Sequence, residues 1–517
     1  MTRQRAAGIL LHPTSLPGSF GIGDLGERAY AFIDFLVAAG QALWQVLPLG
    51  PTGYGDSPYA CFSAFAGNPL LVDLHRLAAE GDLETAELNH TPQFPDDQVD
   101  FGPVIDFKSG LLDRAAARFG ETASADRKSE FHAFCDESAH WLDDYALFRA
   151  LKDDHVGAVW NTWDWPLASR QPDAIKQARS DLATDIFSHK YRQWQFFRQW
   201  ADLKHYANEH AIRIVGDVPI FVAYDSADVW AHPELFHLDH HLTPTRVAGV
   251  PPDYFSPTGQ LWGNPLYRWK SLARQDFRWW TDRIRQTLRT VDTIRLDHFR
   301  GFAAYWDIPA GEPTAVNGRW VKGPGKALFH ALRNALGDVP IIAEDLGFIT
   351  PDVRQLRDQL GLPGMNVLQF AFSTDPENTY LPHNVVPNSV VYTGTHDNDT
   401  TLGWQAACDK EERQRLEAYT GPITEPLNWL FIRMAYQTVC HTAIVPLQDV
   451  LGLDSDARMN APGRFGGNWG WRFKPHDLTP QHAQRLLTLA IASARKKLPR
   501  PTDDEDPFAD YHPAEEE

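Results

Sequence analysis

The chain has 517 residues, of which 43% are hydrophobic and 22% are charged, as is typical of a globular protein. The 67 acidic residues outnumber the 48 basic ones, and the formal net charge is -19 at pH 7. A charge of this sign repels phosphate backbones and anionic lipids, so we expect neither a nucleic-acid nor a membrane partner. No run of about 18 apolar residues occurs. The four cysteines are scattered without a Cys-x-x-Cys pair, which favours residence in the cytoplasm.

Eight apolar runs of strand length recur along the chain, and helical patterns follow several of them. Eight parallel strands with crossover helices are the number that closes an α/β barrel of the (β/α)8, or TIM, type. The strand runs are Gly8–Thr14, Trp44–Leu49, Ile212–Phe221, Thr293–Asp297, Pro340–Glu344, Asn366–Phe372, Ser389–Thr395 and Ala443–Gln448. The helical stretches are Glu27–Ala39, Gln195–Asn208, Arg278–Arg289, Lys326–Leu336, Pro351–Gln359 and Pro480–Lys497.

The spacing of these runs predicts large insertions. About 160 residues separate the second run from the third, whereas a plain βα unit needs roughly 30. We therefore expect inserted subdomains over residues 51–185 after strand two and another over residues 223–270 after strand three, both walling in the catalytic face. The barrel itself is expected within residues 1–500, and the acidic segment 501–517 is expected to be mobile.

Polar residues follow the predicted strands at four places, and in a closed barrel these places converge at one mouth. They are Gly216–Asp217, Arg295–His298, Glu344–Asp345 and His396–Asp399. Each Asp taken alone could cap a helix or fill a turn. Four groups of polar residues at one mouth instead predict a catalytic site. In most glycosidases, a pair of carboxylates flanks the scissile bond.

The acidic residues differ in the neighbours that the sequence predicts for them. Arg295 and Asp297 are two apart on a strand and share a face, so the guanidinium would hold Asp297 ionised, as a nucleophile requires. A general acid must keep its proton, and negative charge on Asp297 and Asp397 would raise the pKa of Glu344. Periodicity alone leaves open whether Glu344 or Asp345 faces inward.

These stretches resemble the amylomaltases, or disproportionating enzymes, of glycoside hydrolase family 77. The matching strings run in order over roughly 440 residues: LHPTSLPG (11–18), QVLPLGPTGYGDSPY (45–59), SAFAGNP (63–69), GDVPIFV (216–222), GVPPDYFSPTGQLWGNPLY (249–267), RLDHFRG (295–301), AEDLG (343–347) and TGTHDNDT (393–400). The resemblance implies a barrel without the C-terminal β-sandwich domain of α-amylases. It also implies a retaining 4-α-glucanotransferase that acts on maltodextrins and other α-1,4-glucans. We expect neither a cofactor nor a metal.

The resemblance further implies roles for single residues. Asp297 would be the nucleophile, Glu344 the general acid and base, and Asp397 the third carboxylate, which stabilises the transition state. Tyr59 would be a platform beneath the sugar, and the loop 249–267 would overhang the cleft. The implied substrate-binding residues are Tyr59, Asp217, Arg295, His396, Tyr254, Phe255, Trp262, Asn264 and Phe370.

Three other functions are weighed against this one. An α-glucan hydrolase would use the same carboxylates, and a carbohydrate-binding protein would keep the aromatic rings without needing the acids. A metal enzyme is suggested by His237, Asp239, His240 and His241, but their spacing fits no standard zinc pattern.

The segment 21–26 has the bare spacing of a dinucleotide fingerprint without its strand-turn-helix context, so a turn is the better interpretation. We expect a monomer or a weak homo-oligomer.

Overall fold

The computed structural model describes residues 5–252, 256–373, 377–464 and 466–496. Eight parallel strands form one sheet in the order β10-β11-β12-β1-β2-β3-β6-β9. Each of them overlaps one of the eight predicted runs, so the (β/α)8 barrel is confirmed. The strands are β1 (Ala6–Leu10), β2 (Leu43–Gln45), β3 (Arg213–Pro219), β6 (Thr293–Asp297), β9 (Ile341–Ala343), β10 (Gly364–Val367), β11 (Ser389–Tyr392) and β12 (Thr442–Pro446).

The barrel closes between β9 and β10, the two ends of the sheet order. The backbone N–H of Ala343 donates to the carbonyl of Pro363 at 2.9 Å. The N–H of Met365 donates to Oδ1 of Asp345 at 2.8 Å, and Arg357 contacts the other carboxylate oxygen of Asp345. The side chain of Asp345 therefore belongs to the seam of the barrel.

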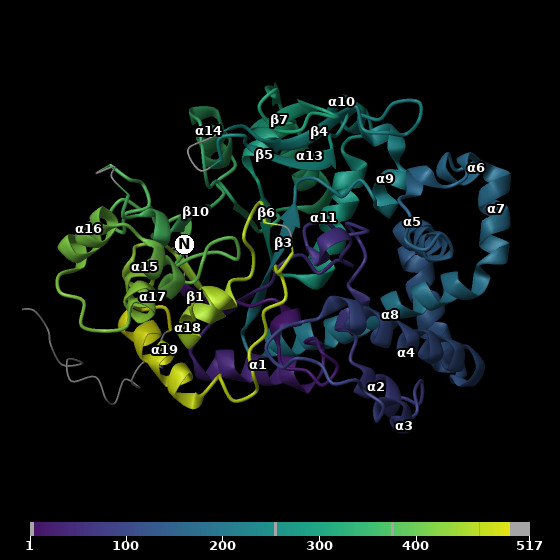
Figure 1. The fold of residues 1–517 in the computed structure, drawn as a ribbon, viewed down its shortest axis with the longest axis horizontal. Helices are drawn as coiled ribbons and strands as arrows, with labels where there is room; N and C mark the ends of the chain where they lie inside the picture. The colour runs from purple at the N-terminus through teal and green to yellow at the C-terminus, as the bar shows by residue number, and fades with distance from the viewer. Residues whose placement is uncertain (1–4, 253–255, 374–376, 465, 497–517) are drawn as a thin grey trace, which may run out of the picture.

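Helices cover the outside of the sheet (Figure 1). Because the strands are packed on both faces, most of their residues are buried, and every residue of β1, β2 and β11 is. A proline in the first turn, where no backbone N–H is needed, begins both α14 and α19. The covering helices are α1 (Glu27–Ala38), α8 (Ala183–Glu209), α11 (Arg278–Thr290), α13 (Lys326–Leu336), α14 (Pro351–Gln359), α17 (Leu427–Gln437) and α19 (Pro480–Ala492).

A helical region separates β2 from β3, and α8 joins it to the barrel. The sequence predicts a helix from Gln195, but α8 begins at Ala183. Its N-terminal half is helical because its aromatic rings pack on two helices of this region, with ring centroids 5.3 Å apart for Phe131 and Phe187 and 5.0 Å apart for Phe119 and Trp194. The other helices here are α2 (Leu74–Ala79), α3 (Thr85–Leu88), α4 (Phe101–Thr122), α5 (Ala125–Asp154), α6 (Trp165–Ala168) and α7 (Pro172–Asp181). The division of residues 51–185 into subdomains stays a prediction.

A second, antiparallel sheet in the order β5-β4-β7-β8 was missed by the sequence analysis. Two of its strands, β4 (Arg246–Val250) and β5 (Gln260–Pro265), follow β3, and the other two, β7 (Ala304–Pro309) and β8 (Arg319–Lys322), follow β6. Figure 1 shows this sheet in teal near α14 and α10 (Trp269–Arg274). Two connections of the barrel thus combine into one small sheet.

The chain after β12 contains, in its described part, α18 (Leu447–Leu451), a short 3-10 helix and α19, and no strand of a sandwich. The connection before β12 carries α15 (Thr401–Ala407) and α16 (Lys410–Thr420). Among the described residues, no helix is long and apolar enough to cross a membrane.

Candidate active site

The acidic residues singled out in the sequence lie at the carboxyl ends of barrel strands. Asp217 lies in β3 and pairs in register with Arg295 in β6, while Pro219 pairs with Asp297. Glu344 directly follows β9, whose Ala343 pairs with Leu296 of β6. Since the carboxyl ends of parallel barrel strands face one mouth, the strands β3, β6 and β9 bring three carboxylates to neighbouring positions.

Arg295 binds two of these carboxylates. Its Nη1 donates to Oδ2 of Asp217 at 2.6 Å and to Oδ1 of Asp297 at 2.9 Å. The side chain of Arg295 is 3% exposed, that of Asp217 is 0% exposed and that of Asp297 is 26% exposed. Burial disfavours the charge, but the two carboxylates raise the pKa of Arg295 well above its ordinary value. The contact predicted from the two-residue spacing is present.

Asp217 is fixed by a second donor. The hydroxyl of Tyr59 donates to Oδ2 of Asp217 at 2.9 Å. Burial raises the pKa of Asp217 to about 7, against the opposing effect of Arg295. The ring of Tyr59 stacks on His396 with centroids 5.0 Å apart and an angle of 13° between planes, and Trp469 lies 5.7 Å away. Tyr59 is therefore held at both its hydroxyl and its ring.

Glu344 has a different environment. Its Oε2 accepts the backbone N–H of His298 at 2.7 Å, and its Oε1 accepts that of Leu346 at 2.8 Å. Burial raises the pKa of Glu344 to about 8 and Asp297 adds to the rise, while Arg295 and the two N–H groups oppose it. The predicted direction is confirmed, but the sequence analysis named neighbouring charges as the cause, whereas burial is the largest. A pKa raised in this direction is what a general acid needs near neutral pH.

The backbone of His298 links Asp297 to Glu344. His298 follows Asp297 and has φ 49°, a left-handed conformation that is uncommon for a residue other than glycine. In this conformation its amide N–H reaches the carboxylate of Glu344, and the next amide, of Phe299, donates to the carbonyl of Glu344 at 3.0 Å. The turn after β6 and the end of β9 are thus held together by the backbone itself.

Asp397 lies after β11 and is held by two residues that the sequence analysis did not identify. Nδ2 of Asn460 donates to Oδ1 of Asp397 at 2.6 Å, and Nη2 of Arg458 donates to its backbone carbonyl at 2.6 Å. Nε2 of His396 lies 3.4 Å from Oδ2 of Asp397, and burial lowers the pKa of His396. The Asp397 side chain is 45% exposed, so it is more open than that of Asp217 or Asp297.

The remaining predicted contacts surround this group less closely. Trp262 packs on His298 with ring centroids 4.8 Å apart at 82°. Nδ2 of Asn264 donates to the carbonyl of Val222 at 2.9 Å, so this amide joins β5 to the segment after β3. Phe370 packs edge-on against Tyr380 at 5.5 Å. Tyr254 and Phe255 lie outside the described residues.

Trp469 is a further residue of this region that the sequence analysis missed. It is 7% exposed, contacts both Tyr59 and His396, and donates its backbone N–H to Met459 at 2.7 Å. Its φ of 66° is left-handed. The glycine-rich run around it, GGNWG at residues 466–470, is the signal that could have drawn attention to this turn.

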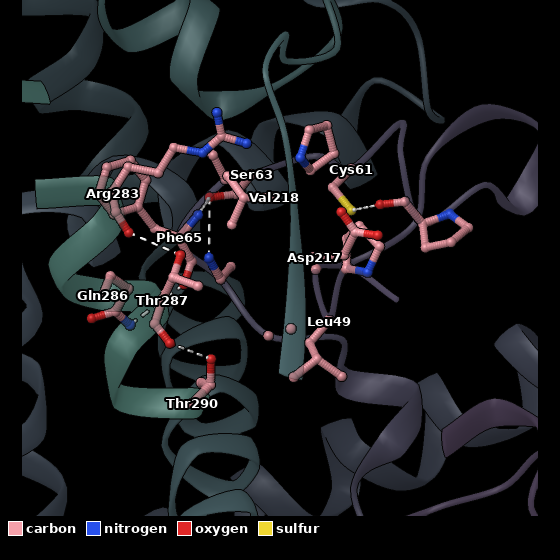
Figure 2. Close-up of a pocket in the computed structure, with 18 of the residues that line it drawn as sticks. Leu49, Cys61, Ser63, Phe65, Asp217, Val218, Arg283, Gln286, Thr287 and Thr290 are labelled. Carbon is pink, nitrogen blue, oxygen red and sulfur yellow. Dashed lines mark hydrogen bonds between the residues drawn. The ribbon is translucent and has the colours of Figure 1, made fainter. Parts of the chain in front are cut away.

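A cavity of about 80 Å³ adjoins the site without including Asp297 or Glu344. Figure 2 shows Arg283, Gln286, Thr287 and Thr290 of α11 on one side and Cys61 with Asp217 on the other. Through Asp217 this cavity borders the back of the site.

The histidine-rich segment considered for a metal forms a turn. Oδ1 of Asp239 accepts the backbone N–H groups of His241 at 2.8 Å and Thr243 at 2.9 Å. Over the described residues, no group of three or more His, Cys, Asp or Glu side chains is arranged to hold a metal ion. Asp239 therefore stabilises a turn.

Comparison with known proteins identifies the family. The sequence model of a family described as 4-alpha-glucanotransferase matches residues 11–479. A 4-alpha-glucanotransferase of Thermus thermophilus is 53% identical over 503 residues, which are 96% of this chain and 100% of that protein. One from Synechocystis sp. is 52% identical over 482 residues, 92% of this chain and 95% of that protein. The solved amylomaltase of Streptococcus agalactiae in complex with acarbose has a TM-score of 0.93 at 39% identity and covers 96% of this chain and 100% of its own. The chain belongs to the 4-alpha-glucanotransferase family.

Proposed function

We propose that this protein cuts α-1,4-glucan chains and rejoins the pieces through a covalent glycosyl-enzyme, with Asp297 as nucleophile and Glu344 as general acid and base. The observation that carries the proposal is the contrast between these neighbouring carboxyl groups. Asp297 accepts from a guanidinium, whereas the half-buried Glu344 accepts from two backbone N–H groups and has its pKa raised by desolvation to about 8. A retaining glycosidase mechanism requires one ionised and one protonated carboxyl group.

In the first half of the reaction, Asp297 attacks the anomeric carbon of the donor. The bond from this carbon to the glycosidic oxygen breaks, and Glu344 gives its proton to the departing oxygen, which leaves as a 4-hydroxyl. Arg295 engages Oδ1 of Asp297, and Oδ2 is the oxygen that we assign to the attack. The product is a β-linked glycosyl-enzyme.

In the second half, a 4-hydroxyl of the acceptor gives its proton to the Glu344 carboxylate and attacks the same carbon. Two inversions restore the α configuration. Between the halves Glu344 is ionised, and the N–H groups of His298 and Leu346 stabilise that charge. The same two amides thus stabilise the ionised form of Glu344, which burial disfavours.

The other polar groups hold the sugar at the cleavage site. We assign Asp397, whose Oδ1 is fixed by Asn460, to the hydroxyls of the distorted sugar, and His396 and Asp217 to its orientation. The ring of Tyr59 is the platform beneath it. Tyr254, Phe255, Trp262, Asn264 and Phe370 are proposed as further contacts to the chain. Rings over the cleft favour transfer, because they exclude water and hold an acceptor at high effective concentration.

Incubation with maltotriose tests the proposal. A transferase converts maltotriose into glucose plus a ladder of longer chains and leaves the number of reducing ends constant. The competing function, an α-glucan hydrolase, produces only shorter chains and new reducing ends. Binding detected by calorimetry with no product at all would support a carbohydrate-binding protein and refute both enzymes.

Assembly and location are also proposals. We propose a monomer or weak homo-oligomer that works on maltodextrins in the cytoplasm, as the scattered cysteines favour. Size-exclusion chromatography at two protein concentrations tests the first part, and fractionation of the source cells tests the second.

A further inference from the structure

Two exposed aromatic rings lie near the proposed catalytic groups without belonging to them. Phe348 is 71% exposed and Trp320 is 38% exposed. Single exposed apolar side chains are common on protein surfaces and identify no site by themselves. These two rings differ from such isolated side chains because one buried cation contacts both of them.

The guanidinium of Arg300 is this support. It lies 3.7 Å from the ring centroid of Trp320 and 5.9 Å from that of Phe348. Arg300 is 7% exposed, and its Nη1 donates to the backbone carbonyl of Phe348 at 2.8 Å. A guanidinium over a ring face is attractive, so Arg300 holds the ring of Trp320 and, at longer range, attracts that of Phe348.

Trp320 has a second support within the small sheet. It pairs in register with Trp306 across β7 and β8, and the two rings meet at 5.1 Å and 66°. Packing on both a guanidinium and an indole restricts the side-chain rotamers of Trp320 before any ligand binds. A ligand that stacks on it therefore costs little ordering entropy.

The rings also lie at the catalytic mouth. Arg300 begins α12 (Arg300–Ala303), three residues after Asp297, and Phe348 comes four residues after Glu344. Both segments leave the carboxyl ends of barrel strands, and the bond from Arg300 to the Phe348 carbonyl joins them. Because Glu344 protonates the leaving group in the proposed reaction, the loop that follows it borders the leaving-group and acceptor side.

We propose that Trp320 and Phe348 form a distal platform for an α-1,4-glucan chain on the acceptor side of the cleft. The ligand is a run of several linked glucose units, whose C–H faces pack on the two rings. The inference rests on the proposed function. Two rings are too small an area for a stable second copy of the chain, since specific protein interfaces bury about 1,200–2,000 Å².

The test compares a short with a long acceptor. Wild type and the Trp320→Ala/Phe348→Ala double variant use the same donor with either glucose or maltoheptaose as acceptor, and kcat/KM is measured for each acceptor. We expect the ratio of long-acceptor to glucose kcat/KM to fall about tenfold, which corresponds to about 1.4 kcal/mol. The Trp320→Tyr/Phe348→Tyr double variant keeps two rings and should retain a ratio near that of wild type.

A matched control is available on another face of the chain. Trp165, at the start of α6, is 50% exposed and belongs to none of the proposed machinery. Trp165→Ala should leave the ratio unchanged. Phe348→Ala alone separates binding from folding, because its ring is mostly exposed, and we expect it to lower the ratio without lowering the melting temperature.

The outcomes separate this proposal from the one on which it rests. If wild type makes a ladder from maltotriose but the ratio is the same in wild type and the double alanine variant, the platform is refuted and the transferase stands. If wild type makes no ladder, the transferase fails first. A change of oligomeric state in Trp320→Ala on size exclusion would instead assign the rings to a protein contact and overturn the platform.

Discussion

Asp297 and Glu344 occupy the ends of neighbouring strands, yet opposite kinds of partner hold them. Asp297 is partly exposed and accepts from the guanidinium of Arg295. Glu344 is also half-buried but accepts from two backbone amides and, among the described residues, has no cation bonded to it, and desolvation raises its pKa to about 8. The comparison shows that a charged partner and desolvation, rather than the choice between Asp and Glu, divide the two roles of the mechanism.

Removing either carboxyl group should have the largest effect. Asp297→Asn and Glu344→Gln should each lower the rate of glucose release from maltotriose by at least about a thousandfold, since one loses the nucleophile and the other the proton donor. Circular dichroism spectra that match wild type would show that the fold is intact. Near-normal turnover in either variant would remove that residue from its role.

Replacing Arg295, the cation beside Asp297, should have the second-largest effect. Arg295→Met leaves the buried Asp217 carboxylate next to Asp297 without a counter-charge. Breaking a buried ion pair costs about 3–5 kcal/mol of unfolding free energy, which urea titration measures. The matched control is Arg319→Met, whose side chain is 71% exposed beside Asp307 and should cost at most about 1 kcal/mol. Equal losses in the two variants would contradict the importance of burial.

The pH dependence of stability and of activity tests the role of Glu344. Its pKa is raised to about 8 in the folded protein from an ordinary value of 4.5. The folded state therefore binds the proton more tightly than the unfolded state. The resulting stabilisation is fully present below pH 4.5 and is lost as pH rises to about 8. Activity should likewise fall about tenfold per pH unit above pH 8, because only protonated Glu344 can act as the acid.

A donor that needs no acid provides the control for this profile. Maltotriosyl fluoride loses fluoride without full protonation, so formation of the glycosyl-enzyme from it should depend less on pH above 8. An alkaline limb of the same steepness with both donors would mean that a group other than Glu344 sets it.

Tyr59→Phe should have the smallest effect. The variant loses the bond from the hydroxyl to Asp217 but keeps the ring stacked on His396. One hydrogen bond to a charged group contributes about 1.5–3 kcal/mol, so kcat/KM for maltotriose should fall by roughly ten- to a hundredfold. Tyr59→Ala should fall further because it also loses the platform. Equal losses would assign the whole contribution to the hydroxyl.

The fold could be predicted where its signals are local. Each barrel strand is an apolar run of its own, and helices such as α13 repeat their pattern within a few turns, so both were found. The small sheet was not, because β4 pairs Ala248 with Asp307 of β7, far along the chain, and its strands are short. The first half of α8 was missed for a related reason, since packing on α4 and α5 rather than its own periodicity makes it helical.

The candidate site divides in the same way. The positions of Asp217, Asp297, Glu344 and Asp397 follow from where strands end, and the contact of Arg295 with Asp297 follows from the two-residue repeat of a strand. The partners Asn460, Arg458 and Trp469 come from a loop after β12 whose return to β11 no local pattern encodes. They were found only once the chain was folded.

The sequence by itself determined the eight strands, the acidic residues at their ends and the side that Arg295 shares with Asp297. These depend on alternation within one strand, which neighbouring residues encode. Only the tertiary structure decided that Asp345 joins the seam with Met365 while Glu344 meets the amides of His298 and Leu346. The physical reason is that desolvation and the closure of a barrel depend on segments that are distant in the chain. Those segments determine both the direction in which a side chain points and its pKa.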